Sequence, residues 1–451
     1  MRVIRRVIAP ALSLFTPGIR NTAHIARNKT QFSAIACSAD TRGISPAMTP
    51  EILRRYADRI ESDLRHNVLP FWIARAVDPQ RGGFHGAITN DLEIRPSAER
   101  GALLACRILW TFSAAYRSFG DAALLAMADH AHATLFDRFH DREHGGFFWS
   151  ASPEGVVLQS RKQIYGQAFA IYALSEYHLA TGKSAPLEQA IALHRLIESR
   201  ARDPLHGGYI EATSREWRPI ADMRLSAVDL NEPKSQNTHL HVMEAYTNLL
   251  RAWPDASLRE AQAALIDTML TRIVNPDTGH LGLFFAFDWA PRSTAVSYGH
   301  DIEAAWLLGE AADVLGDATL QNRVRRVAAK IADATLAEGT DLDGGIFNAG
   351  EPGRVTDTNK EWWPQAEAVL GFLHAYSLSH DERHLAAALC SWDFIENRLI
   401  DRTHGEWFRG VTRNGAILDD QLKVGFWKCP YHNGRMGLLA PAQLRRLASP
   451  V

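Results

Sequence analysis

The 451-residue sequence has little cysteine and no marked excess of charge of either sign. Its four cysteines, Cys37, Cys106, Cys390 and Cys429, show no CxxC spacing. This argues against a disulfide framework or a zinc motif and favours a reducing, cytoplasmic location. The formal net charge of −2 gives no reason to expect nucleic acid or an anionic membrane as partner. No apolar run reaches the roughly 18–20 residues of a membrane span, so we expect a globular protein.

The first 47 residues differ in composition from the rest of the chain. They carry several arginines, and Asp40 is the only acid among them. The apolar run from Val7 to Phe15 follows basic residues as in a signal peptide, but Pro10 interrupts it and no clear A-x-A site follows. We predict a basic leader over residues 1–47, disordered or untranslated, and one folded domain over residues 48–451.

A glycine turn recurs six times, roughly every 60 to 75 residues. The copies are "DPQRGGFHG" from Asp78, "DREHGGFFW" from Asp141, "DPLHGGYIE" from Asp203, "NPDTGHLGL" from Asn275, "DLDGGIFNA" from Asp341 and "DRTHGEWFR" from Asp401. Glycine suits these turns because they require positive φ. The repeat therefore predicts six copies of one structural unit.

Two helical patterns fit between successive turns. Around Ile164 to Leu174, apolar residues recur at every third or fourth position, and Gly182 and Pro186 mark the end of this helix and the start of the next. Comparable pairs span 98–118 with 121–139, 236–253 with 256–273, 300–315 with 319–338, and 361–379 with 382–399, and single helices span 50–72 and 430–446. About twelve helices in six hairpins favour an all-α fold, an (α/α)6 barrel with short β segments at the turns; an open solenoid is the alternative.

Polar and aromatic residues gather at the N-terminal ends of the expected inner helices. In "VSYGHDIEAAW", Asp301 fits a helix N-cap, whereas His300 and Glu303 fit that role poorly. Residues at comparable places are Arg107, Tyr165, Gln167, Asn237, His239, His241, Trp362, Trp363, His432 and, just before the last helix, Trp427. In a ring of parallel inner helices these ends meet at one mouth. Buried polar groups are costly unless paired, so their convergence predicts a functional cavity.

Histidine, arginine and tryptophan together suit proton transfer on a sugar. Two histidines on opposite sides of one carbon could remove a proton and return it. An arginine and a third histidine could stabilise an enediolate oxygen, and tryptophan faces stack on sugar rings. A metal site is the competing use of histidine and glutamate. However, the sequence lacks HExxH, and H-x-x-E at 300–303 with H-x-H at 239–241 names no metal.

From about Met48 to Leu439 the chain resembles the cellobiose 2-epimerases, of the N-acylglucosamine 2-epimerase superfamily. The matching stretches are "RILWTFS", "KQIYGQAFAIYALSEY", "KSQNTHLHVMEAYTNLLRAWPD", "SYGHDIEAAWLL", "KEWWPQAEAVLGF" and "WKCPYHNGRM". The resemblance implies an (α/α)6 barrel, a disaccharide substrate, and no metal or other cofactor. We expect a monomer or weak homo-oligomer. Two departures are the leader and Gly434, where the family pattern has serine.

The resemblance also implies a role for each site residue. His432 and His300 match the two acid/base groups on opposite faces of C2, and Glu303 would orient or tune His300. His241 and Arg107 match the residues that hold the reacting end and stabilise a cis-enediolate.

Further residues are implied to bind the substrate. Tyr165 matches a hydrogen-bonding tyrosine, and Trp363 and Trp427 match the platforms for the two sugar rings. Trp362, next to the first platform, and Asn237, at its helix mouth, complete the expected substrate-binding set.

Three alternatives stay open from the sequence. Within the superfamily, a mannose isomerase or an N-acylglucosamine 2-epimerase would act on monosaccharides. An (α/α)6 glycoside hydrolase would use two carboxylates, such as Asp301 and Glu303, and leave the histidines without a role. A non-catalytic sugar-binding barrel would need only Trp363 and Trp427.

Overall fold

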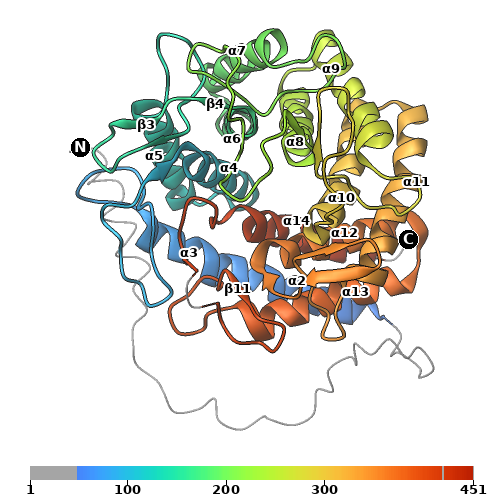
Figure 1. The fold of residues 1–451 in the computed structure, drawn as a ribbon. Helices are drawn as coiled ribbons and strands as arrows, with labels where there is room; N and C mark the ends of the chain where they lie inside the picture. The colour runs from blue at the N-terminus through green and yellow to red at the C-terminus, as the bar shows by residue number, and fades with distance from the viewer. Residues whose placement is uncertain (1–47, 419–420, 450–451) are drawn as a thin grey trace, which may run out of the picture.

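The computed structural model describes residues 48–418 and 421–449, and the predicted leader lies outside them. Six inner helices surround the centre of the molecule: α4 (Ala102–Phe119), α6 (Ile164–Thr181), α8 (Gln236–Ala252), α10 (Tyr298–Leu315), α12 (Trp362–Ser379) and α14 (Tyr431–Leu447). Six outer helices enclose them: α2 (Pro50–Asp63), α5 (Ala122–Arg138), α7 (Ser184–Arg200), α9 (Ala256–Thr268), α11 (Ala318–Ala334) and α13 (Glu382–Phe394). Figure 1 looks along the axis of the two rings.

The ring is closed, which confirms the barrel and excludes the solenoid. Each inner helix packs against the next, and α14 packs back against α4. Helix α2 pairs with α14, so the sixth hairpin joins the first and last helices of the described chain. The inner helices are the more buried: 14 of the 18 residues of α4 are buried, against 7 of the 17 in its partner α5.

Several outer helices end in π-helical turns. These turns are η1 (Leu64–Val68), η2 (Trp72–Ala76), η3 (Met269–Ile273), η4 (Thr335–Gly339) and η5 (Ile395–Leu399), with the short α3 (Leu69–Phe71) between the first two. The helix predicted over 50–72 therefore continues to residue 76. Helix α4 begins four residues later than predicted, because residues 100 and 101 form a strand.

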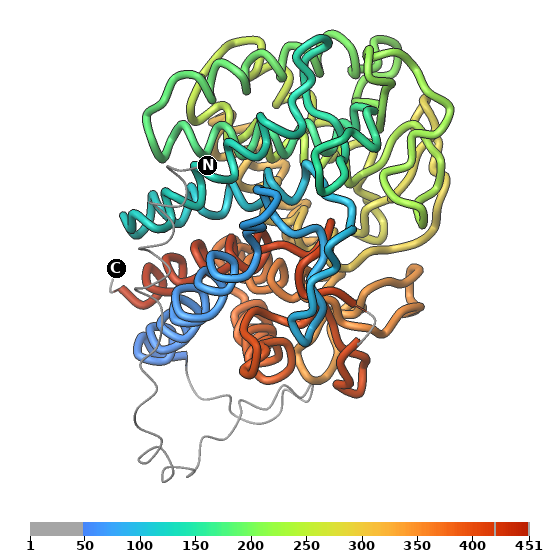
Figure 2. The backbone as a smooth tube through the Cα atoms, turned by 90° about the vertical axis from the view of Figure 1, so that its left-hand side faces the viewer, coloured from blue at the N-terminus to red at the C-terminus, as the bar shows by residue number. Residues whose placement is uncertain are grey.

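Short strands flank the turns. They are β1 (Arg100–Gly101), β2 (Ser150–Ala151), β3 (Val157–Gln159), β4 (Lys162–Gln163), β5 (Ala212–Thr213), β6 (Lys234–Ser235), β7 (Phe284–Phe285), β8 (Ala349–Glu351), β9 (Arg354–Asp357), β10 (Lys360–Glu361) and β11 (Gly410–Val411). The antiparallel pairs are β1–β2, β2–β3, β4–β5, β6–β7, β8–β9 and β10–β11. In Figure 2 the loops lie at one end of the barrel, and α14 (red) runs from that end to the other.

The repeated turns require glycine and carry a buried ion pair. Gly145 and Gly146 have φ of 72° and 70°. A Cβ atom on Gly146 would lie 2.7 Å from the Oε1 atom of Gln167. The first residue of this turn, Asp141, accepts a hydrogen bond of 2.8 Å from Lys162 at the start of the following inner-helix segment. The same pairing joins Asp203 to Lys234, Asp341 to Lys360, Asp78 to Arg100 and Asp401 to Lys423.

The fourth residue of four inner helices also holds a turn. Gln167 accepts from the backbone N–H of Phe147 at 2.9 Å, and Gln365 accepts from that of Ile346 at 2.6 Å. In the other two helices His239 accepts from the N–H of Tyr209, and Asp301 accepts from that of Leu281, both at 2.9 Å.

This arrangement corrects one prediction about Asp301. The N-cap position of α10 belongs to Ser297, and the Asp301 carboxylate is bound to Leu281 and to Nδ1 of His280. A buried carboxylate needs donors, and the neighbouring turn supplies them. His239 likewise serves the turn and not the cavity. Within residues 48–418 and 421–449, no helix is long and apolar enough to span a membrane.

Candidate active site

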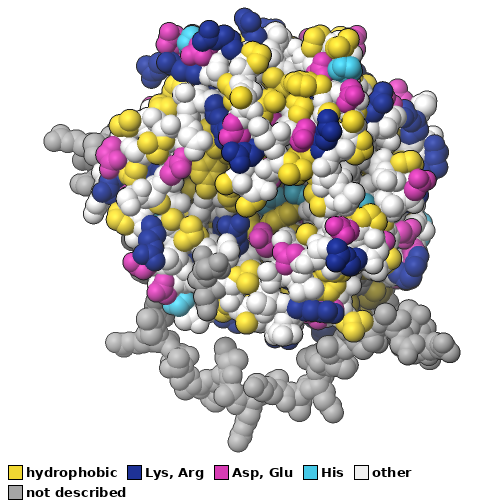
Figure 3. Space-filling model, in the orientation of Figure 1, with side chains coloured by type: hydrophobic (Ala, Val, Ile, Leu, Met, Phe, Trp, Pro, Cys, Tyr) yellow, Lys and Arg dark blue, Asp and Glu magenta, His cyan; other side chains and the backbone are white. Residues whose placement is uncertain are grey.

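One cavity of about 240 Å³ opens between the N-terminal ends of the inner helices. All ten residues predicted for the site line it: Arg107, Tyr165, Asn237, His241, His300, Glu303, Trp362, Trp363, Trp427 and His432. Because these residues come from all six inner helices or the segment before α14, the inner helices run parallel with their N-termini at one mouth. Figure 3 shows this face hollowed near its centre, with histidine side chains visible inside.

Two of the three histidines are fixed by carboxylates. Nδ1 of His241 lies 2.8 Å from Oε2 of Glu244, and Nδ1 of His432 lies 2.6 Å from Oε1 of Glu367. A carboxylate only accepts hydrogen bonds, so each Nδ1 carries the hydrogen. The Nε2 atom of each ring is then left with its lone pair, free to act on a ligand.

The third histidine, His300, is held differently from the prediction. Its Nδ1 atom lies 2.8 Å from Oγ of Ser297, the N-cap residue of α10, three residues before it. Glu303, which was expected to orient it, instead accepts a hydrogen bond of 2.7 Å from Nη2 of Arg435. Glu303 is fully buried, and a buried carboxylate is drawn to the nearest guanidinium because an unpaired one is costly.

Arg435 is the centre of the charged network below the cavity. Its Nη2 atom donates to Glu303 and, at 2.8 Å, to Glu367. Its Nη1 atom donates to Glu244 and to the hydroxyl of Tyr431. One guanidinium thus faces three buried carboxyl groups.

The excess of carboxyl groups sets the protonation of Glu303. Burial, reinforced by the charge of Glu367, raises the pKa of Glu303 well above its ordinary value. Burial also acts on Glu244, but Arg435 and His241 outweigh it and lower the pKa of that carboxyl. Oε2 of Glu303 is buried without a hydrogen-bond partner among the described residues. We therefore assign the network's proton to Glu303.

The same network bears on metal binding. Glu303, Glu367 and His432 could offer ligand atoms within 4.8 Å of one another. However, Arg435 already donates to both carboxylates, and Nδ1 of His432 is bonded to Glu367. The guanidinium supplies the positive charge that an ion would otherwise bring.

Arg107 supplies a positive charge at the cavity wall. Its Nη2 atom donates to the hydroxyl of Tyr165 at 2.6 Å, and Nη1 lies 3.4 Å from the carbonyl oxygen of Trp427. Arginine stays protonated at any physiological pH. The ring of Tyr165 lies edge-on to His241, with 5.0 Å between centroids. The cavity therefore has a fixed cation and a hydroxyl beside one histidine.

The three tryptophans differ in their neighbours and in how far they face the cavity. The ring centroid of Trp363 lies 4.6 Å from that of His300 and 5.5 Å from that of His432. The ring centroid of Trp427 lies 6.0 Å from that of Tyr165, on the other side of the cavity. Trp362 lines the cavity but is only 2% exposed, so it supports Trp363 more than it offers a face. A ligand ring on Trp363 would have histidines close on two sides.

Several residues that shape the site were assigned no role from the sequence. Glu244, Glu367 and Arg435 pair across the barrel, and only their positions near the starts of inner helices hinted at this. The segment Leu225, Ser226, Val228 and Asp229, together with Glu361 and Arg409, forms the outer wall. That segment carries no motif. At Gly434, a Cβ atom would lie 2.7 Å from Cγ2 of Thr111, so α14 lies close to α4 there.

Similar proteins are known over most of the length of this chain. The sequence model of the family described as N-acylglucosamine 2-epimerase (GlcNAc 2-epimerase) matches residues 82–434. A cellobiose 2-epimerase of Bacteroides fragilis is 47% identical over 387 residues, which cover 86% of this chain and 98% of that protein. The structure of a cellobiose 2-epimerase from Spirochaeta thermophila superposes with a TM-score of 0.81 at 38% identity, covering 90% of this chain and 100% of the other. A D-mannose isomerase of Marinomonas mediterranea is 24% identical, covering 81% of this chain and 92% of that protein.

Proposed function

The chain belongs to the N-acylglucosamine 2-epimerase family, and from this membership we infer that it epimerises the reducing-end glucose of β-1,4-linked disaccharides at C2. Cellobiose would give glucosyl-mannose, and lactose would give epilactose. The observation that carries the proposal is the set of three histidines in one cavity beside Arg107, each with Nδ1 bound to the protein. Such a set can move protons on a carbon next to a carbonyl.

The reacting sugar must be open before its C2 proton can be removed. In the open form the C1 carbonyl makes the C2 proton acidic. One of His300 and His432 accepts this proton at Nε2, and the C2–H electron pair forms the C1–C2 double bond. The carbonyl oxygen takes the negative charge, beside Arg107 and His241. After the enediolate turns about C2–C3, the other histidine gives a proton to the opposite face.

The electrostatics of the free site suit the first half of this sequence. Burial lowers the pKa of His300 to about 3, and burial with the charge of Arg107 lowers that of His432 well below its ordinary value. Both imidazoles are therefore neutral at pH 7 and keep the Nε2 lone pair, although the lowered pKa makes each a weaker base in the free site. The enediolate is an anion, and an anion beside an imidazole favours its protonated form. The second histidine can thus take a solvent proton once the intermediate has formed and give it to C2, while the first histidine returns its proton to solvent.

The alternatives fit the geometry less well. A glycoside hydrolase needs a carboxylic acid and a carboxylate free to act on the glycosidic bond, whereas Glu303 and Glu367 are bound to Arg435 and Asp301 holds a turn. A mannose isomerase would return the proton to C1 of the same enediolate. We place this second because the D-mannose isomerase of Marinomonas mediterranea is 24% identical to this chain, whereas the cellobiose 2-epimerase of Bacteroides fragilis is 47% identical.

We further propose that the enzyme works in the cytoplasm in carbohydrate metabolism, as a monomer or weak homo-oligomer, with residues 48–451 as one catalytic domain. The interruption of the apolar run at Pro10 and the lack of a clear A-x-A site after it support the location. Sedimentation analysis would measure the oligomeric state.

The test is proton NMR of cellobiose incubated with the protein in D2O. We expect the reducing-end mannose epimer to appear with deuterium at C2. A ketose product would show the isomerase reaction, and free glucose would show hydrolysis. If cellobiose stays unchanged while mannose or N-acetylglucosamine reacts, the substrate is a monosaccharide.

A further inference from the structure

The sixth glycine turn departs from the earlier ones at its second glycine position. Gly146 and Gly208 hold this position in the second and third turns, with φ of 70° and 74°. In the sixth turn Glu406 holds it and still has a positive φ of 60°. A residue other than glycine is strained in this backbone region, and strained residues of this kind cluster at functional sites. The side chain of Glu406 is therefore the part of this turn to follow.

Glu406 makes a bond that an inner helix makes in other units. In four units the fourth residue of the inner helix accepts from the backbone N–H that follows the turn, as Gln167 does from Phe147. The fourth residue of α14 is Gly434, which has no side chain to offer. The equivalent N–H, that of Trp407, is accepted at 3.0 Å by Oε1 of Glu406 itself. Helix α14 is therefore not tied to its turn in the way of those four helices.

The segment between the sixth turn and its inner helix is also longer. In the units of α6, α8 and α12, the helix begins two residues after the lysine that pairs with the turn aspartate. In the sixth unit that lysine is Lys423, and α14 begins only at Tyr431. The additional residues include Trp427, which lines the active-site cavity. The lysine pair alone therefore fixes neither Trp427 nor His432.

The carboxylate of Glu406 ties this segment to the turn. Its Oε1 atom accepts from Nδ2 of Asn433 at 2.8 Å and from Nζ of Lys428 at 2.5 Å. Asn433 follows His432 in the first turn of α14, and Lys428 follows Trp427. Glu406 and Lys428 are both fully buried, where such bonds are stronger than in water. One oxygen atom thus holds the chain neighbours of two residues that line the cavity.

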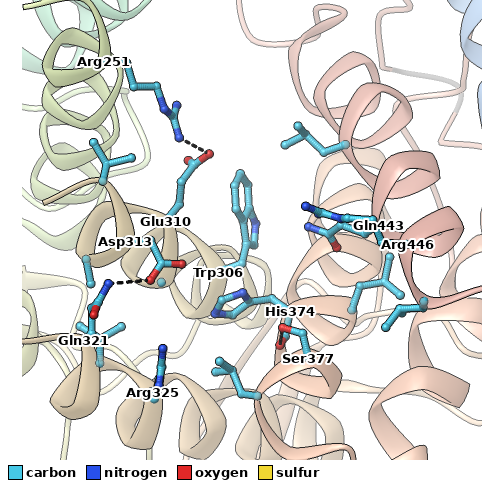
Figure 4. Close-up of a pocket in the computed structure, with 18 residues that line it drawn as sticks. Arg251, Trp306, Glu310, Asp313, Gln321, Arg325, His374, Ser377, Gln443 and Arg446 are labelled. Atoms are coloured by element: carbon cyan, nitrogen blue, oxygen red, sulfur yellow. Dashed lines mark hydrogen bonds and ion pairs between the residues drawn. The ribbon is translucent and has the colours of Figure 1, made fainter. Parts of the chain in front are cut away.

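The C-terminal half of α14 is less closely packed on its inner side. Pro441 lies within the helix and lacks the N–H that would continue the helical hydrogen bonds. A cavity of about 650 Å³ lies between this half and α10, with Gln443 and Arg446 on one side and Trp306 on the other (Figure 4). The contacts at the N-terminal end of α14 therefore contribute more to the placement of His432.

We propose that Glu406 is a positioning residue of the active site, which places His432 through Asn433 and Trp427 through Lys428. The inference rests on the proposed function, because proton transfer is what the placement of His432 serves. Glu406 does not itself line the cavity, so it acts only through the residues that it holds. A misplacement of about 1 Å in a reacting group can cost about 100-fold in rate, which makes such a tie measurable.

Two variants cut different bonds of the same carboxylate. Asn433→Leu removes the bond to α14. The matched control is Trp72→Phe, which removes the bond of 2.6 Å from Nε1 of Trp72, in η2, to Oε2 of Glu406. Both replaced side chains are buried, and both variants leave Glu406 paired with Lys428. Urea unfolding measures how much stability each one loses.

Kinetics with cellobiose give the first readout. In Asn433→Leu we expect kcat to fall by at least about 10-fold and KM to stay within about three-fold, because His432 is displaced while Lys428 still holds Trp427. Trp72→Phe should keep both values within about two-fold, since it leaves the ties to the active site in place. A merely structural role for Glu406 would not separate kcat from KM in this way.

The second readout is NMR of the full chain with 15N-labelled histidine. The Nδ1–H group of His432, which is bonded to Glu367, is assigned by its loss in His432→Asn. Its resonance should shift or broaden in Asn433→Leu and in Glu406→Gln, which is far from His432 in the sequence, and should stay in place in Trp72→Phe. This readout needs no turnover. It therefore tests the positioning even if the parent protein leaves cellobiose unchanged, a result that would count against the proposed function alone.

Three results would overturn the proposal. The first is a folded Asn433→Leu variant that keeps the kcat of the parent. The second is an equal loss of kcat in Asn433→Leu and Trp72→Phe, which would show a general loosening of the fold. The third is a His432 resonance that stays in place in Glu406→Gln, the variant that decides the matter if Asn433→Leu does not fold.

Discussion

Nδ1 of His432 donates a hydrogen bond of 2.6 Å to Oε1 of Glu367, a residue on the neighbouring inner helix. This bond fixes the ring and leaves Nε2 facing the cavity. The same carboxylate is tied to Arg435 at 2.8 Å and to Trp306 at 3.0 Å. The proposed base therefore rests on a carboxylate that is itself held at three points.

Removing either proposed base should abolish proton transfer. In His432→Asn or His300→Asn we expect kcat for cellobiose epimerisation to fall by at least about 1,000-fold, because general acid–base catalysis contributes on this scale. The assay is formation of the epimer by NMR, with the fold checked by circular dichroism. Near-normal turnover in a folded variant would exclude that histidine as a base.

Replacing Glu303 or Glu367 by glutamine should lower kcat by different amounts. Glu303 carries the network's proton, so Glu303→Gln replaces a neutral acid with a neutral amide and should cost less than about 10-fold in kcat. Glu367→Gln removes the charge next to His432 and should cost about 100-fold or more. The two kcat values, measured side by side with cellobiose, check this. Equal losses would contradict the assignment of the proton to Glu303.

His239 should make the folded state less stable in acid. Burial lowers its pKa from 6.5 to about 4. Below pH 6.5 the unfolded chain gains a proton at this residue and the folded chain does not. The free energy of unfolding therefore falls as the pH drops from 6.5 to 4, by about 3 kcal/mol at most for this group.

His239→Gln isolates this effect. Gln365, the equivalent residue of α12, accepts from a turn N–H and donates to the carbonyl four residues earlier, as His239 does. The variant should fold, and its unfolding free energy should fall less between pH 6.5 and 4 than that of the parent. Urea unfolding at several pH values measures both slopes. Parallel slopes would show that His239 does not titrate as stated.

The buried lysines of the turns should contribute different amounts to the free energy of unfolding. Lys234 pairs with Asp203, whereas Lys162 pairs with Asp141, which Arg215 also binds at 3.0 Å. Lys234→Met leaves a carboxylate without its partner and should cost about 3 kcal/mol of unfolding free energy. Lys162→Met should cost clearly less. Urea unfolding at pH 7 compares them, and a larger loss in Lys162→Met would refute the argument.

The sequence by itself determined the repeat and the helical fold of this protein. The glycine turns fixed the period because positive φ leaves few other residues possible, and the apolar spacing between them fixed two helices per repeat. A closed ring of parallel inner helices then brought His241, His300 and His432 to one mouth. These features are readable because each depends on residues that are close in sequence.

Only the tertiary structure decided which side chains of the site pair with one another. His432 and Glu367 are 65 residues apart, and Arg435 and Glu244 are 191 apart, so no local pattern pairs them. The family resemblance implied that Glu303 serves His300, but its carboxyl group pairs with the guanidinium of Arg435 instead. Partner choice among buried charges depends on which opposite charge lies nearest across the core, and chain order does not encode that directly.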